Sequence, residues 1–425
     1  MTYEEAQNTI LKYSSHRSCL DLERMQQLNM LAGEPDNNLK FIHIAGTNGK
    51  GSTSVMIAQI LKEAGYKVGL FTSPSLQAFN ERLQINGVMI SDKELFAISN
   101  ELEPLLKKME EPPTEYELTT EIAFNYFKNN NCDIVILEVG LGGRFDATNI
   151  IKAPELAIIT AINFDHTQLL GNTLKDITLE KCGIIKSYSN VLLFDQEDEI
   201  CNTVVEVCKQ RSANLTIADF SQIHIKSQTL KGQILDINEF HNLFLPLLGH
   251  HQSKNACVAI NAVKLLSKHG FNISNNAIYN GLKNAFIPAR FEIINKPPLV
   301  ILDGGHNPQC FDVLINTLNE YFNKKIVFVI GVLKDKDYKL MIKKIAPIAK
   351  FCYTVTPNSP RALQANELSK LLTPLNIPNI CCESVDHALN LATFNTKDII
   401  CCAGSLYLAG DIRNYFKLKA GQKLI

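Results

Sequence analysis

Short apolar runs alternate with helix-length amphipathic segments along this chain from residue 39 onward. In the first part of the chain, the runs that predict strands cover residues 39–46, 66–73, 132–140 and 155–164. A helix is expected over residues 51–65, between the first two of these runs. Apolar strands that are separated by helices predict a parallel sheet with both faces covered.

The same pattern restarts near residue 298, and further strands are expected over residues 298–305, 325–332 and 398–405. Lys296, Pro297 and Pro298 form the best linker candidate, because prolines resist helix continuation and stiffen a connection. A chain of 425 residues is also long for one ordinary domain. We therefore expect two α/β domains, residues 1–295 and 296–425, with ligands at the carboxyl ends of the strands.

The charge and the hydrophobic pattern of the chain argue against some classes of binding partner. The formal net charge is −1, which leaves no general footprint for nucleic acid or for a membrane surface. No uninterrupted apolar stretch is long enough to span a bilayer, and the acidic, polar N-terminus does not resemble a signal peptide. We therefore expect a cytoplasmic protein, in which the twelve cysteines are reduced thiols without zinc spacing.

The strongest motif lies between an expected strand and an expected helix and consists of Gly46, Thr47, Asn48, Gly49, Lys50, Gly51 and Ser52. Glycines let successive backbone N–H groups face a polyphosphate, and the helix N-terminus adds a partial positive charge. Lys50 is expected to reach the terminal phosphates, and Ser52 to support a magnesium shell. The spacing differs from the common phosphate-loop form and from the dinucleotide fingerprint. The alternative interpretation is a glycine-rich turn without a ligand.

Together with eight downstream strings, this loop resembles the folylpolyglutamate synthase and dihydrofolate synthase family, a branch of the Mur ligase superfamily. The strings occur in family order from about residue 20 to about residue 413, which makes their combination specific although each alone is weak. They are Thr72-Ser73-Pro74, Phe79-Asn80-Glu81-Arg82, residues 138–149 (EVGLGGRFDATN), Asp165-His166, residues 180–186 (EKCGIIK), residues 288–292 (PARFE), residues 303–308 (DGGHNP) and residues 404–410 (GSLYLAG).

The resemblance implies an N-terminal P-loop ATPase domain, which also binds folate, and a smaller Rossmann-like C-terminal ligase domain. It implies that ATP phosphorylates the carboxylate of dihydropteroate or of a reduced folate, after which the amine of L-glutamate displaces phosphate. Charge on the transferring phosphoryl group requires magnesium and cationic donors. We expect two Mg²⁺ ions, ATP as co-substrate and a monomeric protein.

By the same resemblance, Ser73, Glu138 and His166 are the protein ligands of the magnesium ions. His166 is the unusual member of the set, because imidazole prefers softer metals. Taken alone, it would be expected in a hydrogen-bonding role in a loop or core. Lys181 resembles the family lysine that carries a carbamate, and the alternative is an exposed lysine paired with Glu180. Lys50, Lys181 and His166 are the expected catalytic residues.

Further ATP contacts implied by the resemblance come from Asn255, Arg290, Asp303 and His306. Arginine suits this place because its planar fork offers several donors to phosphate oxygens, whereas Asn255 alone would be expected to cap a helix.

By the same resemblance, Asp146, Tyr116 and Arg82 are expected to form the folate pocket. The alternatives are a core aromatic at Tyr116 and a loop cation at Arg82. Ser75 and Gly305 depart from the family pattern, which commonly has histidine and alanine there.

Two other functions remain open at this point. A muramyl-peptide ligase would perform the same reaction class, but its loop usually lacks the glycine that stands here at Gly51, and a separate N-terminal domain usually precedes it. A P-loop switch that hydrolyses ATP without ligation would not need Arg290, Asp303 and His306 in a second domain. A requirement of ATP turnover for both a folate-like carboxylate and glutamate separates these functions.

Overall fold

The computed structural model describes residue 10, residues 21–295 and residues 297–419, so the N-terminal stretch used for the signal-peptide prediction lies almost entirely outside the described residues. The larger sheet has eight strands in the order β4-β3-β2-β5-β1-β6-β7-β8. Its strands are β1 (Phe41–Ala45), β2 (Val68–Phe71), β3 (Leu83–Ile85), β4 (Val88–Met89), β5 (Ile134–Glu138), β6 (Leu156–Ile159), β7 (Asn190–Phe194) and β8 (Asn214–Ala218).

Six of these strands run parallel, and β3 and β4 extend the sheet antiparallel at one edge. β1 and β5 are buried along their whole length, as expected for strands covered on both faces. The predicted parallel sheet is therefore confirmed, together with the strands expected near residues 39, 66, 132 and 155.

Helices cover both faces of this sheet and separate its core into distinct clusters. One face carries α3 (Lys50–Glu63), α9 (His250–Lys268) and α10 (Asn275–Lys283). The opposite face carries α2 (Glu23–Leu31), α4 (Asp92–Leu106), α5 (Glu115–Asn129), α7 (Leu174–Lys181) and α8 (Asp198–Gln210). The connections contain the short helix α6 (Thr167–Leu170) and the 3₁₀ turns η1 (Pro35–Asn38), η2 (Phe79–Arg82), η3 (Ala147–Ile150) and η4 (Cys182–Ile184). The expected helix after the phosphate loop is confirmed as α3.

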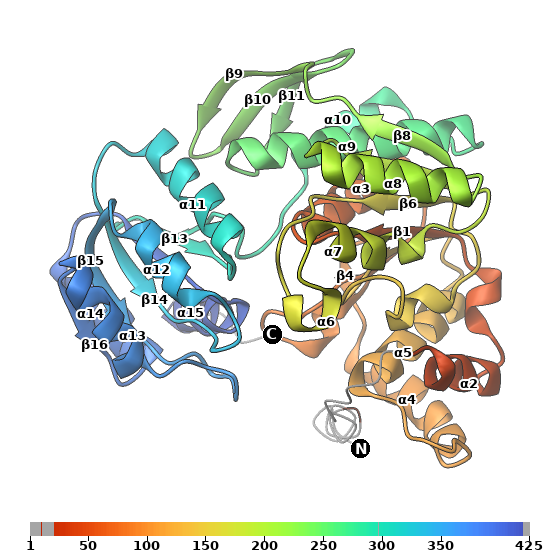
Figure 1. Cartoon of the computed structure of the whole chain (residues 1–425), viewed down its shortest axis with the longest axis horizontal. Helices are drawn as coiled ribbons and strands as arrows, with labels where there is room; N and C mark the ends of the chain where they lie inside the picture. Colours follow the sequence, from red (N-terminus) through yellow and green to blue (C-terminus); the bar gives the residue numbers. More distant parts are fainter. Residues whose placement is uncertain (1–9, 11–20, 296, 420–425) are drawn as a thin grey trace.

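A separate three-stranded antiparallel sheet, which the apolar pattern did not predict, lies beside α9 and α10. It consists of β9 (Ile223–Thr229), β10 (Gly232–Ile237) and β11 (Phe240–Leu245) in the order β11-β10-β9. Leu235 and Leu243 bury its inner face in the same cluster as Ile260 of α9. Figure 1 shows this small sheet at the top of the molecule, next to α9 and α10.

The second domain is built on a six-stranded sheet in the order β12-β13-β17-β14-β15-β16. Its strands are β12 (Glu292–Asn295), β13 (Val300–Asp303), β14 (Ile326–Ile330), β15 (Ala349–Thr354), β16 (Asn379–Cys381) and β17 (Ile400–Ala403). All pairs except β12 with β13 are parallel. One face is covered by α11 (Pro308–Tyr321), α12 (Tyr338–Ile345) and α13 (Ala365–Leu372), and the 3₁₀ turn η5 (Thr373–Leu375) follows α13. The other face is covered by α14 (Val385–Asn395) and α15 (Leu406–Lys419).

The expected boundary between residues 295 and 296 falls inside this second sheet. β12 lies before that boundary, yet it pairs antiparallel with β13, and Glu292 lies opposite Leu302. The prolines after Lys296, which is itself outside the described residues, therefore connect two paired strands and do not link two domains. The sequence misplaced the linker because a proline pair marks any stiff connection, whether between strands or between domains.

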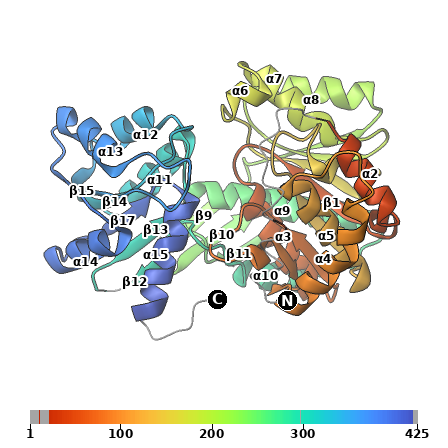
Figure 2. The ribbon, with the colours of Figure 1, turned by 90° about the horizontal axis from the view of Figure 1, so that it is seen from below.

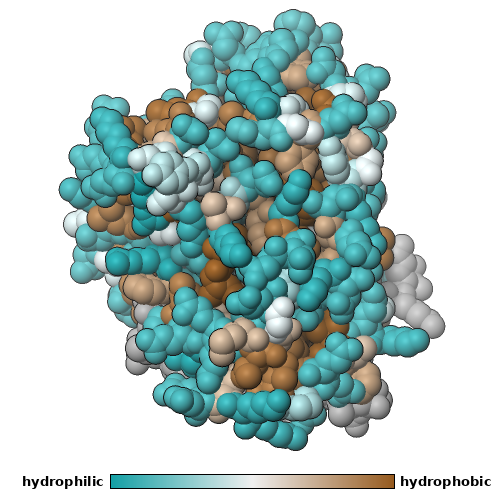
Figure 3. All heavy atoms as spheres, turned by 90° about the vertical axis from the view of Figure 1, so that its right-hand side faces the viewer, coloured by the Kyte–Doolittle hydropathy of each residue, from teal (hydrophilic) through white to brown (hydrophobic). Residues whose placement is uncertain are grey.

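The two domains lie side by side, with the second domain at the left of Figure 1 and of Figure 2. Figure 3 shows the outer face of the first domain, where hydrophilic side chains predominate and hydrophobic ones show between them. No helix in the described part of the chain is both long and apolar enough to cross a membrane. The carboxyl ends of β1, β2, β5 and β6 bear the chemically interesting residues of the first domain, and that of β13 bears those of the second.

Candidate active site

The phosphate loop, residues 46–52, connects β1 to α3 and is held against the segment after β6. The N–H groups of Thr47 and Asn48 donate to the carbonyl of Ala161 at 2.8 and 3.0 Å. A side chain at Gly46 would not fit, because its Cβ would lie 1.8 Å from Oγ1 of Thr160. Gly49 has a φ of 86°, and no side chain caps α3. The N-terminus of α3 therefore offers its backbone N–H groups to an anionic ligand.

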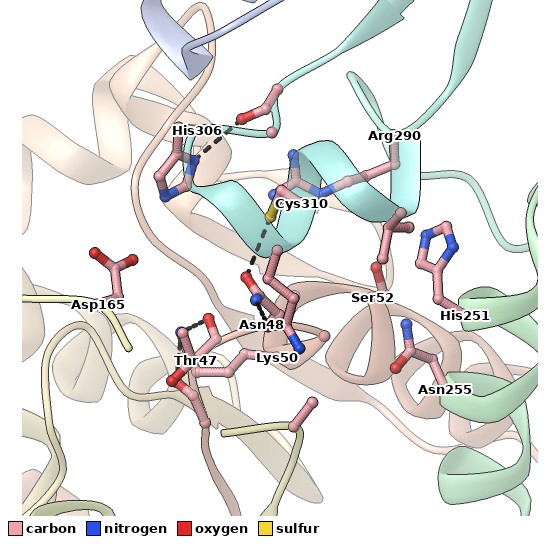
Figure 4. A pocket seen from close by; sticks show the side chains of 18 of the residues that line it. Thr47, Asn48, Lys50, Ser52, Asp165, His251, Asn255, Arg290, His306 and Cys310 are labelled. Atoms are coloured by element: carbon pink, nitrogen blue, oxygen red, sulfur yellow. Dashed lines mark hydrogen bonds between the residues drawn. The ribbon is translucent and has the colours of Figure 1, made fainter. Parts of the chain in front are cut away.

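A cavity of about 600 Å³ opens between this loop and the second domain (Figure 4). Its lining includes the whole phosphate loop and, from the rest of the predicted ATP and metal set, Ser73, Glu138, His166, Lys181, Asn255, Arg290, Asp303 and His306. Asn255 of α9 touches the loop, since its Oδ1 lies 2.7 Å from where a Cβ on Gly49 would stand. The structure thus brings together residues that are up to 260 positions apart in the sequence.

Two lysines converge on one backbone carbonyl at the floor of the cavity. Lys50 Nζ donates to the carbonyl oxygen of Gly46 at 3.0 Å and to that of Thr47 at 3.3 Å. Lys181, at the end of α7, donates to the same oxygen of Gly46 at 3.0 Å and is buried. Burial, assisted by the charge of Lys50, lowers the pKa of Lys181 to about 7. Lys181 is therefore not the exposed, ion-paired lysine that the alternative interpretation described.

Glu138 ends β5 beside the phosphate loop, with only 5% of its surface exposed. Burial raises the pKa of its carboxyl to about 7, against the opposing charges of Lys50 and Arg290. Ser73 follows β2, the strand next to β5, and lines the same cavity. Hydroxyl and carboxylate oxygens are ligands that Mg²⁺ prefers, and a bound cation would offset the cost of burying the carboxylate. The donors at Ser73 and Glu138 therefore fit magnesium.

His166 lies at the start of α6, and its backbone has a φ of 50°. Burial lowers the pKa of its imidazole, so the ring is neutral at neutral pH. Lys336 of the second domain places its Nζ atom 3.4 Å from Nε2 of His166. An ammonium can only donate, so the Nε2 lone pair faces a cation, as it would in a metal ligand. Within the described part of the chain, no three His, Cys, Asp or Glu residues cluster as a metal site.

The residues of the second domain form an ordered turn after β13. Asp303 accepts hydrogen bonds from the N–H groups of Phe291 and Gly305 at 2.9 and 2.8 Å. A Cβ on Gly305 would lie 2.8 Å from Oδ1 of Asp303, so this departure from the family pattern relieves a close contact. Arg290 donates to the carbonyl of Ala289 at 3.1 Å, and within the described chain this is the only hydrogen bond of its guanidinium. Most of its N–H donors are therefore free to bind phosphate oxygens.

The N-terminus of α11 makes a direct contact with the phosphate loop from the opposite side of the cavity. Asn307, which caps α11, donates to Oδ1 of Asn48 at 3.2 Å, and Cys310 Sγ lies 3.3 Å from the same atom. Gln309 accepts a hydrogen bond from the amide of Asn48. Figure 4 shows the side chains of Asn48 and Cys310 in direct contact. The second domain therefore contacts the first directly at the loop that would bind phosphate.

The predicted folate residues lie together beside the cavity without lining it. Tyr116 OH lies 3.4 Å from Oδ1 of Asp146, and the Arg82 guanidinium stacks over the Tyr116 ring at 5.6 Å. Arg82, the last residue of η2, is buried and forms an ion pair with Glu115 at 2.5 Å. Gly140 lines the cavity, and a Cβ on it would lie 2.6 Å from Cζ of Tyr116. Tyr116 therefore packs directly behind the cavity wall. Whether these three residues bind folate stays a prediction.

Sequence reasoning did not find Lys336, His251 or the α11 residues that contact Asn48. Lys336 stands in the charged string Lys334-Asp335-Lys336-Asp337, which is typical of a solvated loop. His251 lines the cavity, and burial lowers the pKa of its imidazole to about 4. No local pattern marks these residues, because their role depends on contacts between two domains.

The chain matches two family models, the Mur ligase middle domain over residues 44–263 and the Mur ligase glutamate ligase domain over residues 289–406. It is 36% identical to the dihydrofolate synthase/folylpolyglutamate synthase of Bacillus subtilis, over 93% of this chain and 95% of that protein. A protein of the same name from Escherichia coli is 31% identical over 87% of this chain and 85% of that protein.

Solved structures agree with this relationship. Mycobacterium tuberculosis folylpolyglutamate synthase complexed with ADP superimposes with a TM-score of 0.90 at 28% identity, covering 97% of this chain and 98% of that one. Escherichia coli FolC in complex with DHPP and ADP gives a TM-score of 0.86 at 29% identity, covering 99% of both chains. This chain belongs to the dihydrofolate synthase/folylpolyglutamate synthase family of ATP-dependent Mur ligases.

Proposed function

We propose that this protein uses ATP to join L-glutamate to the carboxylate of dihydropteroate and of a reduced folate, with ADP and phosphate as products. The observation that carries the proposal is the single cavity in which the phosphate loop of the first domain faces Arg290, Asp303 and His306 of the second. A nucleotide switch has no need of such a second set of groups. The named relatives favour a folate substrate over a muramyl peptide.

In the first step, an oxygen of the substrate carboxylate attacks the γ-phosphorus of ATP, the bond to the ADP oxygen breaks, and an acyl phosphate forms. Lys50 and Arg290 offset the charge on the phosphate oxygens during this transfer, and the N–H groups of the loop and of α3 orient them. Contacts between α11 and Asn48 hold the domains together over the site. Closure excludes water, which would otherwise hydrolyse the acyl phosphate.

In the second step, the uncharged amine of glutamate attacks the acyl carbon, phosphate leaves, and the nitrogen loses a proton to give the amide. We propose that Ser73 and Glu138 hold one Mg²⁺ ion and that His166 contributes to a second, in place of its contact with Lys336. Magnesium supplies charge neutralisation between phosphate oxygens. Lys181, as a carbamate, would add an anionic oxygen donor in the same region.

We further propose that the first domain carries the phosphate loop and the folate residues, and that the second domain, whose sheet includes β12, supplies the remaining ATP contacts. A monomer suffices, since one chain supplies both walls of the cavity. The described cysteines are all free, which suits a cytoplasmic enzyme.

Product analysis tests the proposed function directly. The protein is incubated with ATP and glutamate, and with either dihydropteroate or tetrahydrofolate, and products are identified by mass spectrometry. We expect one glutamate to be added to each acceptor, with ADP formed only when acceptor and glutamate are both present. ADP release that is independent of the acceptor would contradict ligation and would support a switch.

A further inference from the structure

A buried histidine lies behind the proposed folate residues and takes no part in the mechanism above. His43 is the middle residue of β1, between Ile42 and Ile44, and none of its surface is exposed. It lies opposite Leu137 of β5 and Ala157 of β6 in the centre of the larger sheet. An apolar side chain would normally occupy such a position, because a buried polar group without full hydrogen bonding is costly.

The imidazole is hydrogen-bonded on one side only. Its Nε2 atom lies 2.8 Å from Oγ1 of Thr148, in the turn η3, and Thr148 is also fully buried. Its other nitrogen, Nδ1, is buried and has no partner among the residues that the structure describes. Burying Nδ1 without a partner costs free energy, and, among the described residues, the hydrogen bond to Thr148 is the one that the imidazole makes in return.

The Thr148 hydroxyl connects this histidine to Asp146. Thr148 Oγ1 lies 2.5 Å from Oδ1 of Asp146, and the carboxylate can only accept, so the hydroxyl donates. Its oxygen must then accept from His43, which fixes the proton of His43 on Nε2 and leaves Nδ1 bare. Burial, with a contribution from Lys186, lowers the pKa of His43 to about 3, in agreement with a neutral ring.

Asp146 is held firmly by this network. Its Oδ1 also accepts from the N–H of Thr148 at 3.0 Å, and its Oδ2 from the N–H of Leu141 at 2.8 Å. The remaining contact, with Tyr116 OH at 3.4 Å, is the longest of the set and lies on the side of the cavity wall. Hydrogen bonds in a chain polarise one another, so a donor on Thr148 Oγ1 strengthens the bond from Thr148 to Asp146.

We propose that His43 is a positioning residue for the pterin end of the substrate, acting through Thr148 to fix the orientation of the Asp146 carboxylate. The inference rests on the proposed function, in which Asp146 accepts from pterin N–H groups. His43 touches no substrate. Through Thr148, it determines which carboxylate oxygen of Asp146 accepts the hydrogen bond from the Thr148 hydroxyl, and therefore how the carboxylate is oriented toward the ligand.

Two pairs of variants test this role in the full-length protein. His43→Leu removes the donor, and His43→Gln keeps an amide N–H at a similar distance. Thr148→Val removes the hydroxyl, and Thr148→Ser restores it. Thr203→Val in α8 is the matched control, because Thr203 is a buried threonine whose hydroxyl bonds only the backbone of its own helix. Melting temperature, KM for dihydropteroate and KM for ATP are measured for each.

We expect His43→Leu and Thr148→Val to raise KM for dihydropteroate by about tenfold, with KM for ATP changed by less than about twofold. His43→Gln and Thr148→Ser should recover most of the loss, and Thr203→Val should leave both values unchanged. Equal losses for the two substrates, or a loss of melting temperature alone, would overturn the positioning role.

Nitrogen-15 NMR of the imidazole gives a second readout, which does not depend on turnover. We expect the Nε2-protonated tautomer of His43 in the wild type and loss of that preference in Thr148→Val. A Nδ1-protonated ring in the wild type would overturn the inference. A wild type without pterin-dependent turnover would contradict the proposed function instead, so the two failures are distinguishable.

Discussion

The Nζ atom of Lys336 lies 2.7 Å from Oδ1 of Asp165, and this ion pair joins the two domains beside the proposed ATP cavity. Both side chains are mostly buried, at 8% and 13% exposure. Burial alone would raise the pKa of Asp165, but the charge of Lys336, together with that of His166 once its ring is protonated at low pH, outweighs burial and lowers the pKa to about 2. The pair is a buried contact between domains, and removal of one partner would leave an uncompensated charge.

We expect Lys336→Met to weaken domain closure and to lower ligation by about tenfold or more. The double variant Lys336→Met/Asp165→Asn should be less impaired than Lys336→Met, because it leaves no unpaired carboxylate. Small-angle scattering with bound ATP analogue and turnover are the measurements, and the exposed Lys334→Met is the control. Unchanged dimensions and turnover in Lys336→Met would argue against a closing role.

The pH dependence of this pair follows from the lowered pKa. Asp165 titrates at about 2 in the folded protein, below its ordinary value of 3.8. Its contribution is therefore present above about pH 4 and is lost only as the pH falls toward 2. Closure measured by scattering should not change between pH 6 and 8, and a change in that range would have to come from another group.

Lys50→Ala should lower ligation by about 100-fold or more with the fold intact, because Lys50 offsets phosphate charge and is not part of the core. Circular dichroism and steady-state turnover are compared with the wild type. Lys62→Ala is the matched control, since Lys62 is an exposed lysine on the same helix. Turnover near the wild-type level in Lys50→Ala would refute the phosphate-loop assignment.

Much of the fold follows from local patterns. The runs around β1 and β5 are apolar on both faces except at His43 and Glu138, so their burial in a parallel sheet was predictable from residues 39–46 and 132–140 alone. The sheet of β9 to β11 was not, because its strands are only partly buried and mix polar with apolar residues, in a region without a long apolar run. β12 was assigned to the wrong side of the boundary, because its pairing with β13 is a tertiary contact.

The residues of the site also fall into those that the sequence predicted and those that it did not. Gly46, Gly49 and Lys50 were found because the loop and the helix that follow β1 are adjacent in sequence, and the backbone requirement is visible in the glycines. Lys181 was found only through the resemblance, whereas Glu138 is also conspicuous as a carboxylate at the end of an apolar strand. Lys336 was missed, since its partner Asp165 is 171 positions away and nothing in a charged loop marks one lysine as buried.

Lys181→Ala should lose activity, and acetate or formate should partly restore it by replacing the carbamate oxygens. Carbamate forms when an uncharged amine adds to carbon dioxide and releases a proton, so it requires the unprotonated lysine. The lowered pKa of Lys181, about 7, supplies that form at neutral pH. Lys175 is an exposed lysine on the same helix. Lys175→Ala is therefore the control.

Carbon-13 NMR in labelled bicarbonate measures the modification itself. The carbamate signal should increase as the pH rises through about 7, because deprotonation of Lys181 frees the amine. It should be absent in Lys181→Ala. A bare ammonium seen at Lys181 in a crystal structure with metal and nucleotide bound would count against the carbamate.

Dihydropteroate and tetrahydrofolate both offer a carboxylate for phosphorylation, so discrimination between them depends on how the pterin end is held. Asp146 is buried and already accepts three hydrogen bonds from Thr148 and Leu141, which fixes it as an acceptor for pterin N–H groups. Asp146→Ala should weaken dihydropteroate ligation by about tenfold or more, equivalent to about 1.4 kcal/mol of transition-state binding. Tetrahydrofolate ligation should fall less if its pterin binds elsewhere, and the exposed Asp195→Ala should change neither. Equal losses for both acceptors, or a wild type inactive with dihydropteroate, would refute the assignment of both activities to this one site.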